Sequence, residues 1–173
     1  MITVVFGGAS SGKSEIAENI AMSQGQNRLY IATMIPYSNE GKKRVAKHLN
    51  KRCGKGFSTI ERYVDLENIS IERCDVALLE CVGNLLANEM YEVDGDKKNA
   101  VNRIVNGVKN LSKMVDNLVI VTNDVFKSVA NYSDESTQYV ENFAIITREL
   151  FEIADTVLEI KCGIPLVLKG ENI

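Results

Sequence analysis

The 173-residue sequence lacks the features that mark zinc sites, disulfide frameworks and membrane spans. Its four cysteines stand far apart without a C-x-x-C pair, which argues against a zinc site or a disulfide scaffold and favours reduced thiols. No apolar run approaches the roughly 20 residues that a membrane helix requires. The chain also opens without the charged start and apolar stretch of a secretory signal. These absences predict a cytoplasmic protein with no stable membrane insertion.

The sequence has no surplus of positive charge either. It holds 20 Lys and Arg against 23 Asp and Glu, for a net charge of −3, so broad nucleic-acid binding is not expected. It contains no internal repeat, low-complexity tract or linker. Because one domain usually takes about 100–200 residues, we expect residues 1–173 to form a single domain.

What the sequence does contain is an alternation of short apolar runs with helical periodicities. Strands are expected at Ile2–Phe6, Leu29–Thr33, Phe57–Arg62, Asp75–Glu80, Leu118–Thr122, Thr156–Lys161 and Pro165–Lys169. Helices are expected at Lys13–Met22, Gly41–Arg52, Val82–Met90, Lys97–Val115 and Asp134–Ala154. Continuous apolar strands that alternate with helices predict an α/β fold, in which a mainly parallel sheet carries helices on both faces. The last two strands meet at a short glycine turn and predict a C-terminal antiparallel edge hairpin.

The most specific motif is the segment Gly7–Ser14, which matches G-x-x-x-x-G-K-[ST] in full between an expected strand and an expected helix. Its glycines let backbone N–H groups turn around a β-phosphate, Lys13 reaches the β and γ oxygens, and the Ser14 hydroxyl binds Mg²⁺. The helix contributes the positive end of its dipole. The alternative interpretation of this segment is a Gly/Ser-rich strand-to-helix turn that binds no ligand. We predict a P-loop NTPase fold of the RecA-like type that binds a purine triphosphate through Gly7, Gly8, Ala9, Ser10, Ser11, Gly12, Lys13 and Ser14.

Three acidic residues, Glu61, Glu80 and Asp124, follow or end expected strands. Ligands of open α/β sheets bind at the carboxyl ends of the strands. Glu80 is the best candidate for an acid near magnesium, on the expectation that its strand lies beside the P-loop strand. The alternative for Glu80 is a solvated carboxylate at a strand end.

The single histidine, His48, lies in the basic segment Gly41–Arg52. A histidine nitrogen can attack an α-phosphorus and form a covalent nucleotidyl intermediate. Neighbouring cations would stabilise the phosphates and lower the imidazole pKa toward the neutral nucleophile. On the residues alone, a solvated histidine on a basic helix is the more ordinary interpretation. His48 and Lys13 are the catalytic candidates.

Several collinear segments together resemble one family: GGASSGKSEIAENIA, LYIATM, RVAKH, TIE, VALLECVGNLLANEM, VIVTND and IADTVLEIKCGIPLVLKG. The family is the bifunctional adenosylcobinamide kinase / adenosylcobinamide-phosphate guanylyltransferase of cobalamin assembly. The resemblance covers nearly the whole chain and implies two reactions at one site. A nucleoside triphosphate, ATP or GTP, phosphorylates the aminopropanol hydroxyl of adenosylcobinamide. GTP then transfers GMP to that phosphate through a guanylylated histidine, which gives adenosylcobinamide-GDP and pyrophosphate.

The resemblance also assigns roles to individual residues. His48 falls on the guanylylated position, counted from Arg44. The resemblance also implies a homotrimer, while the expected magnesium-binding residues remain Ser14, from the P-loop motif, and Glu80, from its place at a strand end. The nucleotide-contacting positions outside the P-loop fall on Thr33, Met34, Ile35, Glu61 and Glu80.

The sequence departs from the family pattern at four places. They are Ser10 where the P-loop usually has Arg, Phe57 where Trp is usual, Phe126–Asn131 in place of a glycine-rich loop, and Thr147 in place of a common Asn. Two alternatives therefore stay open. One is a P-loop small-molecule kinase without guanylyltransferase activity, and the other is a nucleotide-gated binding protein that retains the phosphate cradle without turnover.

Overall fold

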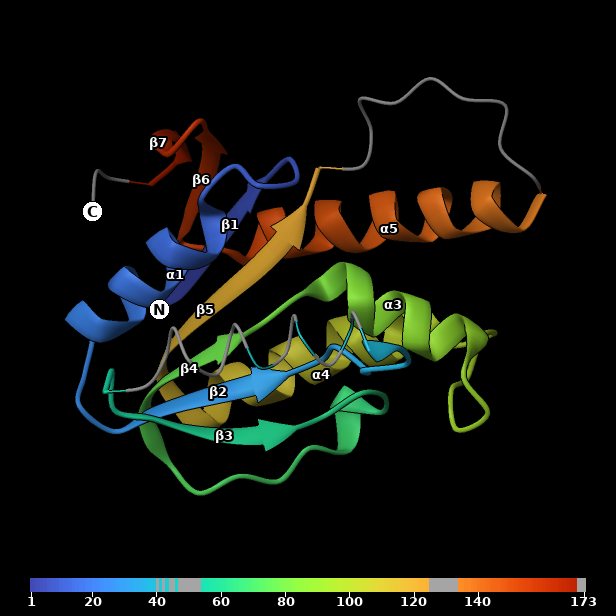
Figure 1. Ribbon diagram of the computed structural model, residues 1–173, viewed down its shortest axis with the longest axis horizontal. Helices are drawn as coiled ribbons and strands as arrows, with labels where there is room; N and C mark the ends of the chain where they lie inside the picture. The colour runs from blue at the N-terminus through green and yellow to red at the C-terminus, as the bar shows by residue number, and fades with distance from the viewer. Residues whose placement is uncertain (40, 42, 44–45, 47–53, 125–133, 171–173) are drawn as a thin grey trace.

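The computed structural model describes residues 1–39, 41, 43, 46, 54–124 and 134–170. Figure 1 shows a central sheet with helices packed against it. In chain order the elements are β1 (Ile2–Gly7), α1 (Lys13–Ser23), β2 (Arg28–Ala32), β3 (Phe57–Glu61), the 3₁₀ turn η1 (Leu66–Asn68), β4 (Cys74–Leu79), α3 (Val82–Tyr91), α4 (Ala100–Met114), β5 (Val115–Asn123), α5 (Asp134–Ile153), β6 (Thr156–Lys161) and β7 (Ile164–Lys169).

The sheet has seven strands in the order β3-β2-β4-β5-β1-β6-β7. Every neighbouring pair is parallel except β6 and β7, which pair antiparallel at one edge. The predicted mainly parallel α/β sheet and its C-terminal edge hairpin are both confirmed. Parallel pairing brings the ends of β1, β2, β3, β4 and β5 to one edge of the sheet, which we call the carboxyl edge.

The two faces of the sheet carry different helices. Helix α1 covers one face, where Ala17 and Ile20 join a buried cluster with strand residues such as Val5. Helices α3, α4 and α5 cover the other face, where Leu85 and Phe143 belong to a larger buried cluster. The strands β1, β2, β4, β5 and β6 are mostly buried, which explains their continuous apolar runs, whereas the edge strands β3 and β7 are largely exposed. Among the described residues, no helix has the length and apolar character needed to cross a membrane.

Two elements start three residues away from the predicted position, whereas the other differences in element bounds are of one residue. Helix α4 begins at Ala100 rather than Lys97, because the Asp96 side chain accepts hydrogen bonds from the backbone N–H (3.2 Å) and side-chain amide (2.8 Å) of Asn99. Such a local turn competes with helix formation. Strand β5 begins at Val115, directly after α4 ends.

One expectation about strand order was wrong. The strand that precedes Glu80, β4, does not lie beside the P-loop strand β1, because β5 lies between them. Leu118 of β5 pairs with Ala77 of β4, and Ile120 of β5 pairs with Val4 of β1. The long apolar run of β5 is buried on both faces and takes this central place. His48, most of the segment Gly41–Arg52 and the segment Phe126–Asn131 lie outside the described residues.

Candidate functional site: a phosphate loop and a neighbouring polar cluster

The P-loop follows β1 directly and has the turned backbone that a phosphate cradle requires. Ser10 has φ 57° and Gly12 has φ 92°, both in the left-handed region. A Cβ atom on Gly7 would lie 2.6 Å from the carbonyl oxygen of Ile160, so the loop leaves β1 where only glycine fits. Alternating backbone conformations of this kind aim successive N–H groups into one concavity that binds anions.

Helix α1 begins at Lys13, and its N-cap residue Gly12 provides no side-chain acceptor for the first N–H groups of the helix. Those N–H groups and the positive end of the helix dipole therefore suit an anion. Around Gly8 there is open space, with no atom within 4 Å of a Cβ built there. These local features fit a phosphate group.

The ammonium group of Lys13 is held at the same loop. Its Nζ atom donates a 3.0 Å hydrogen bond to the carbonyl oxygen of Gly8. Burial lowers the pKa of Lys13, while the nearby Cys81 thiol acts in the opposite direction. A partly desolvated ammonium interacts more strongly with an anion than a solvated one does, so Lys13 is placed to bind phosphate oxygens.

A second polar cluster lies where β2, β3 and β4 end. Atom Oε2 of Glu80 accepts hydrogen bonds from the backbone N–H groups of Thr33 (2.8 Å) and Met34 (3.1 Å). The Thr33 hydroxyl donates to the carbonyl oxygen of Cys81 at 3.0 Å. The Glu80 carboxylate thus fixes the backbone that leaves β2.

Glu61, the last residue of β3, belongs to the same cluster. It pairs with Ala32 in the sheet, next to Thr33. Burial, a hydrogen bond with Glu61, and the charges of Glu61 and Glu80 together raise the pKa of Tyr63 to about 12. Tyr63 therefore stays neutral beside the exposed Glu61 carboxylate.

The predicted nucleotide-binding residues thus fall into two groups along one edge. The P-loop follows β1, whereas Glu80 follows β4 two strands away, a lateral separation of about 10 Å. Glu61 follows β3, four strands from β1, or about 19 Å. The P-loop and the end of β4 thus lie on either side of the end of β5. Sequence reasoning gave no sign of the roles of Tyr63 and Cys81, since neither belongs to a recognisable spacing.

The chemistry of the P-loop also fits a magnesium ion that arrives with a nucleotide. Ser14 is exposed in the first turn of α1 and offers a hydroxyl oxygen. In the described part of the chain, no group of three or more His, Cys, Asp or Glu side chains could hold a metal. Mg²⁺ commonly takes only one or two protein ligands and completes its coordination with phosphate oxygens and water, so a lone hydroxyl at a phosphate cradle suits it.

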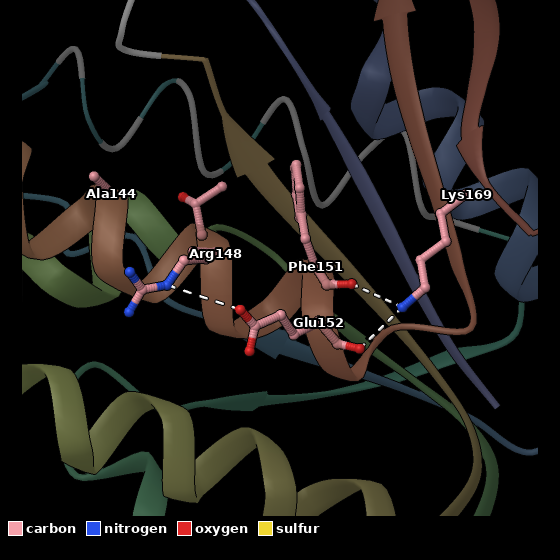
Figure 2. Close-up of a pocket in the computed structure, with 6 residues that line it drawn as sticks. Ala144, Arg148, Phe151, Glu152 and Lys169 are labelled. Atoms are coloured by element: carbon pink, nitrogen blue, oxygen red, sulfur yellow. Dashed lines mark hydrogen bonds and ion pairs between the residues drawn. The ribbon is translucent and has the colours of Figure 1, made fainter.

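Two surface hollows help to locate the binding region. One of about 350 Å³ is lined by Met34, Ile35, Tyr37, Ser38, Gly41, Asn84, Ala87 and Asn88. It includes two predicted nucleotide-contacting residues and adjoins the polar cluster. A larger hollow of about 630 Å³ lies between α5 and β7 (Figure 2), where Phe151 and Lys169 line it. Lys169 donates to the last carbonyl oxygens of α5, at the end of β7 remote from the P-loop, so this larger hollow lies away from the carboxyl edge.

Comparison with known proteins identifies the family. A family model described as cobinamide kinase / cobinamide phosphate guanyltransferase matches residues 3–168. The chain belongs to this family of enzymes. The resemblance drawn from the P-loop and the collinear segments is therefore confirmed.

Two curated relatives extend over the same length. The bifunctional adenosylcobalamin biosynthesis protein CobP of Pseudomonas aeruginosa is 26% identical over 179 residues, which cover 99% of this chain and 99% of CobP. The bifunctional adenosylcobalamin biosynthesis protein CobU of Escherichia coli K12 is 27% identical over 183 residues, which cover 98% of this chain and 100% of CobU. The cobinamide kinase family match is therefore not confined to the nucleotide motif.

Solved structures support the fold. An ATPase domain aligns with a TM-score of 0.51 and 9% identity, covering 91% of this chain and 68% of that domain. A protein of Pyrococcus horikoshii OT3 aligns with a TM-score of 0.53 and 10% identity, covering 99% of this chain and 87% of that protein. At such low identity these likenesses concern the fold alone, and they agree with the predicted P-loop NTPase fold.

Proposed function

We propose that this protein phosphorylates the aminopropanol hydroxyl of adenosylcobinamide and then guanylylates the product. The second reaction transfers GMP from GTP and yields adenosylcobinamide-GDP in cobalamin biosynthesis. The proposal is carried by one observation: a turned P-loop with a partly buried Lys13, in a chain matched by the cobinamide kinase / guanyltransferase model over residues 3–168.

In the first reaction, the substrate hydroxyl oxygen attacks the γ-phosphorus of ATP or GTP. The bond from the γ-phosphorus to the bridging oxygen breaks, the nucleoside diphosphate leaves and the hydroxyl proton is released. The P-loop N–H groups and Lys13 hold the phosphates in position and stabilise charge on the transferred group. Mg²⁺, when bound at Ser14, would neutralise charge on the β and γ oxygens. A role for Glu80 near this ion is part of the proposal.

In the second reaction, a His48 ring nitrogen attacks the α-phosphorus of GTP. A P–N bond forms, the α–β bridging bond breaks and pyrophosphate leaves. A phosphate oxygen of adenosylcobinamide phosphate then attacks the same phosphorus and the P–N bond breaks. Covalent catalysis of this kind divides one difficult transfer into two easier ones. Met34, Ile35, Glu61 and Glu80 contact the nucleotide in this scheme.

The test uses adenosylcobinamide, magnesium and GTP labelled either in the γ- or in the α-phosphate. We expect γ-label in adenosylcobinamide phosphate and in the adenosylcobinamide-GDP made from it, and α-label in adenosylcobinamide-GDP alone, with both products separated by chromatography. Formation of γ-labelled adenosylcobinamide phosphate alone would indicate the small-molecule kinase. Tight nucleotide binding without either product or any phosphate release would indicate the nucleotide-gated binding protein.

We also propose that the protein assembles as a homotrimer. Strand β7 lies at the edge of the sheet, and three of its apolar side chains, Ile164, Leu166 and Leu168, are 62%, 40% and 58% exposed. An exposed edge with apolar side chains favours association with another surface. Light scattering during size-exclusion chromatography should give three times the 19.2 kDa chain mass. Leu166→Glu should shift the mass toward the monomer, and a monomeric wild-type protein would refute the proposal.

A further inference from the structure

The side-chain amide of Asn88, on α3, joins the two loops that carry the polar cluster. Its Nδ2 atom donates a 2.9 Å hydrogen bond to the carbonyl oxygen of Thr33 and another, also 2.9 Å, to the carbonyl oxygen of Tyr63. Thr33 follows β2 and Tyr63 lies two residues after β3. One nitrogen atom thus uses both of its hydrogens to join two chain segments that are 30 residues apart.

The interactions of Asn88 complete a frame around Thr33. The backbone N–H of Thr33 donates to Glu80, its hydroxyl donates to Cys81, and its carbonyl accepts from Asn88. Thr33 is fully buried, and Asn88 is 6% exposed. Buried polar groups that are all hydrogen-bonded hold one conformation, because each broken bond leaves an unsatisfied group.

The next residue of α3 fixes the second loop further along. The carboxylate of Glu89 is fully buried and accepts a hydrogen bond from the backbone N–H of Asp65. Asn88 and Glu89 therefore anchor the chain at Tyr63 and at Asp65. Glu61 lies two residues before Tyr63 and pairs with Ala32, which precedes Thr33, so both chain segments beside Glu61 are tied to α3.

We propose that Asn88 is a positioning residue for nucleotide binding, which holds the Met34–Ile35 backbone and the Glu61–Tyr63 pair in their binding arrangement. This inference rests on the proposed function, since it takes GTP as the ligand of this cluster. Asn88 also lines the 350 Å³ hollow together with Met34 and Ile35, so its amide lies at the wall of the region that it organises. Its role is indirect: it sets the geometry of groups that contact the nucleotide.

The substitution that tests this most sharply is Asn88→Asp. It preserves the shape of the side chain but replaces the donating nitrogen by an oxygen, which would face two carbonyl oxygens. The matched control is Asn117→Asp, at the start of β5. The Asn117 amide also joins two backbone carbonyls, those of Gln24 (3.4 Å) and Asp75 (3.3 Å), but at the opposite edge of the sheet.

Two quantities are measured for each variant: GTP affinity by calorimetry, and hydrogen exchange of the segments around Thr33 and Tyr63 by mass spectrometry. Asn88→Asp should weaken GTP binding by about tenfold or more, because small displacements of contacting groups have large effects. It should also speed exchange in both segments. Asn117→Asp should leave GTP affinity and those segments unchanged.

The possible outcomes separate the inference from the function. Wild-type GTP affinity in a folded Asn88→Asp variant would overturn the inference, even if exchange were faster, because Asn88 would then be structural only. If Asn88→Asp does not fold, Asn88→Ala, which leaves room for water at both carbonyls, takes its place with the same criteria. Failure of the wild-type protein to bind GTP would instead refute the proposed function itself.

Discussion

The backbone N–H of Gly163 donates a 2.8 Å hydrogen bond to the carbonyl oxygen of Ser11. Gly163 lies in the turn between β6 and β7, and Ser11 lies in the middle of the P-loop. The C-terminal hairpin, at a residue 152 positions further along the sequence, therefore supports the phosphate cradle directly. Gly163 has φ +79°, a conformation that glycine adopts without strain.

This contact predicts a remote effect on nucleotide binding. Gly163→Val places a β-branched side chain in the left-handed region, which is strained by roughly 1–2 kcal/mol. We expect the turn to shift, the support of Ser11 to weaken, and nucleotide affinity measured by calorimetry to fall several-fold. Gly163→Asn is the control, since Asn tolerates this conformation, and it should bind nucleotide like the wild type. Equal affinities for all three proteins would show that the hairpin does not support the loop.

Lys13→Ala should abolish both half-reactions while leaving the fold intact. The Lys13 ammonium makes a single hydrogen bond, to Gly8, among the described residues, and it does not belong to the buried core. Removing a charge that stabilises phosphate oxygens costs two or more orders of magnitude in turnover. Product formation by folded, magnesium-saturated Lys13→Ala at the wild-type rate would contradict the P-loop assignment. The melting temperature checks the fold.

Two substitutions at Glu80 separate its charge from its structural hydrogen bonds. Glu80→Gln can still present one oxygen to the N–H groups of Thr33 and Met34, whereas Glu80→Ala loses both bonds. If the charge organises magnesium, Glu80→Gln should keep the wild-type melting temperature but lose one or more orders of magnitude in magnesium-dependent turnover. Glu80→Ala should lose both stability and turnover. Wild-type activity and magnesium dependence in Glu80→Gln would place the acid elsewhere, with Asp124 the next candidate.

The ion-pair network behind the polar cluster predicts a stability effect. Arg103 lies within 2.7 Å of Asp65 and within 3.1 Å of Glu89, whose side chain is fully buried. Arg103→Gln leaves that buried carboxylate without its cation, which should destabilise the protein by about 3 kcal/mol in denaturant unfolding. The exposed pair Arg73–Asp116 supplies the control. Arg73→Gln should cost less than about 1 kcal/mol, and similar losses in the two variants would contradict the assignment.

The same network should make stability fall in acid. Burial alone would raise the pKa of Asp65, but hydrogen bonds from Arg103 and Asn68 and the nearby arginine charges outweigh it and lower that pKa. A carboxyl group with a lowered folded-state pKa stabilises the protein above its unfolded value, about 3.9, and this contribution disappears as the pH falls through the folded-state pKa. Denaturant unfolding below pH 4 should therefore show that the free energy of unfolding decreases less with falling pH in Arg103→Gln than in the wild type.

Much of the fold could be predicted from the sequence, because its signals are local. Continuous apolar runs mark strands buried on both faces, and the G-x-x-x-x-G-K-[ST] spacing marks a strand-to-helix turn. Spatial order is not local. Nothing in the sequence places β5 between β4 and β1, and this is why the expectation of a Glu80 strand beside the P-loop strand was wrong.

The same difference between local signals and spatial arrangement applies to the candidate site. The P-loop and the acids at strand ends were named from sequence because their chemistry follows a motif or a strand boundary. The role of Asn88 could not be named, since it depends on contacts across 25 and 55 residues and matches no spacing. Glu80 was interpreted as a metal-organising acid, and its two backbone hydrogen bonds appear only in the folded chain.

The measurement that tests the central claim most directly is covalent labelling by α-labelled GTP in wild type and His48→Asn. His48 is the only histidine, so no other imidazole can replace it. The wild type should acquire a label that is labile in acid and stable in alkali, as a phosphoramidate bond requires, and γ-labelled GTP should leave none. His48→Asn should lose the label and guanylyl transfer while retaining cobinamide phosphorylation. A label that persists in His48→Asn would contradict the account, and equal loss of both activities in the folded variant would make His48 a nucleotide-positioning residue instead.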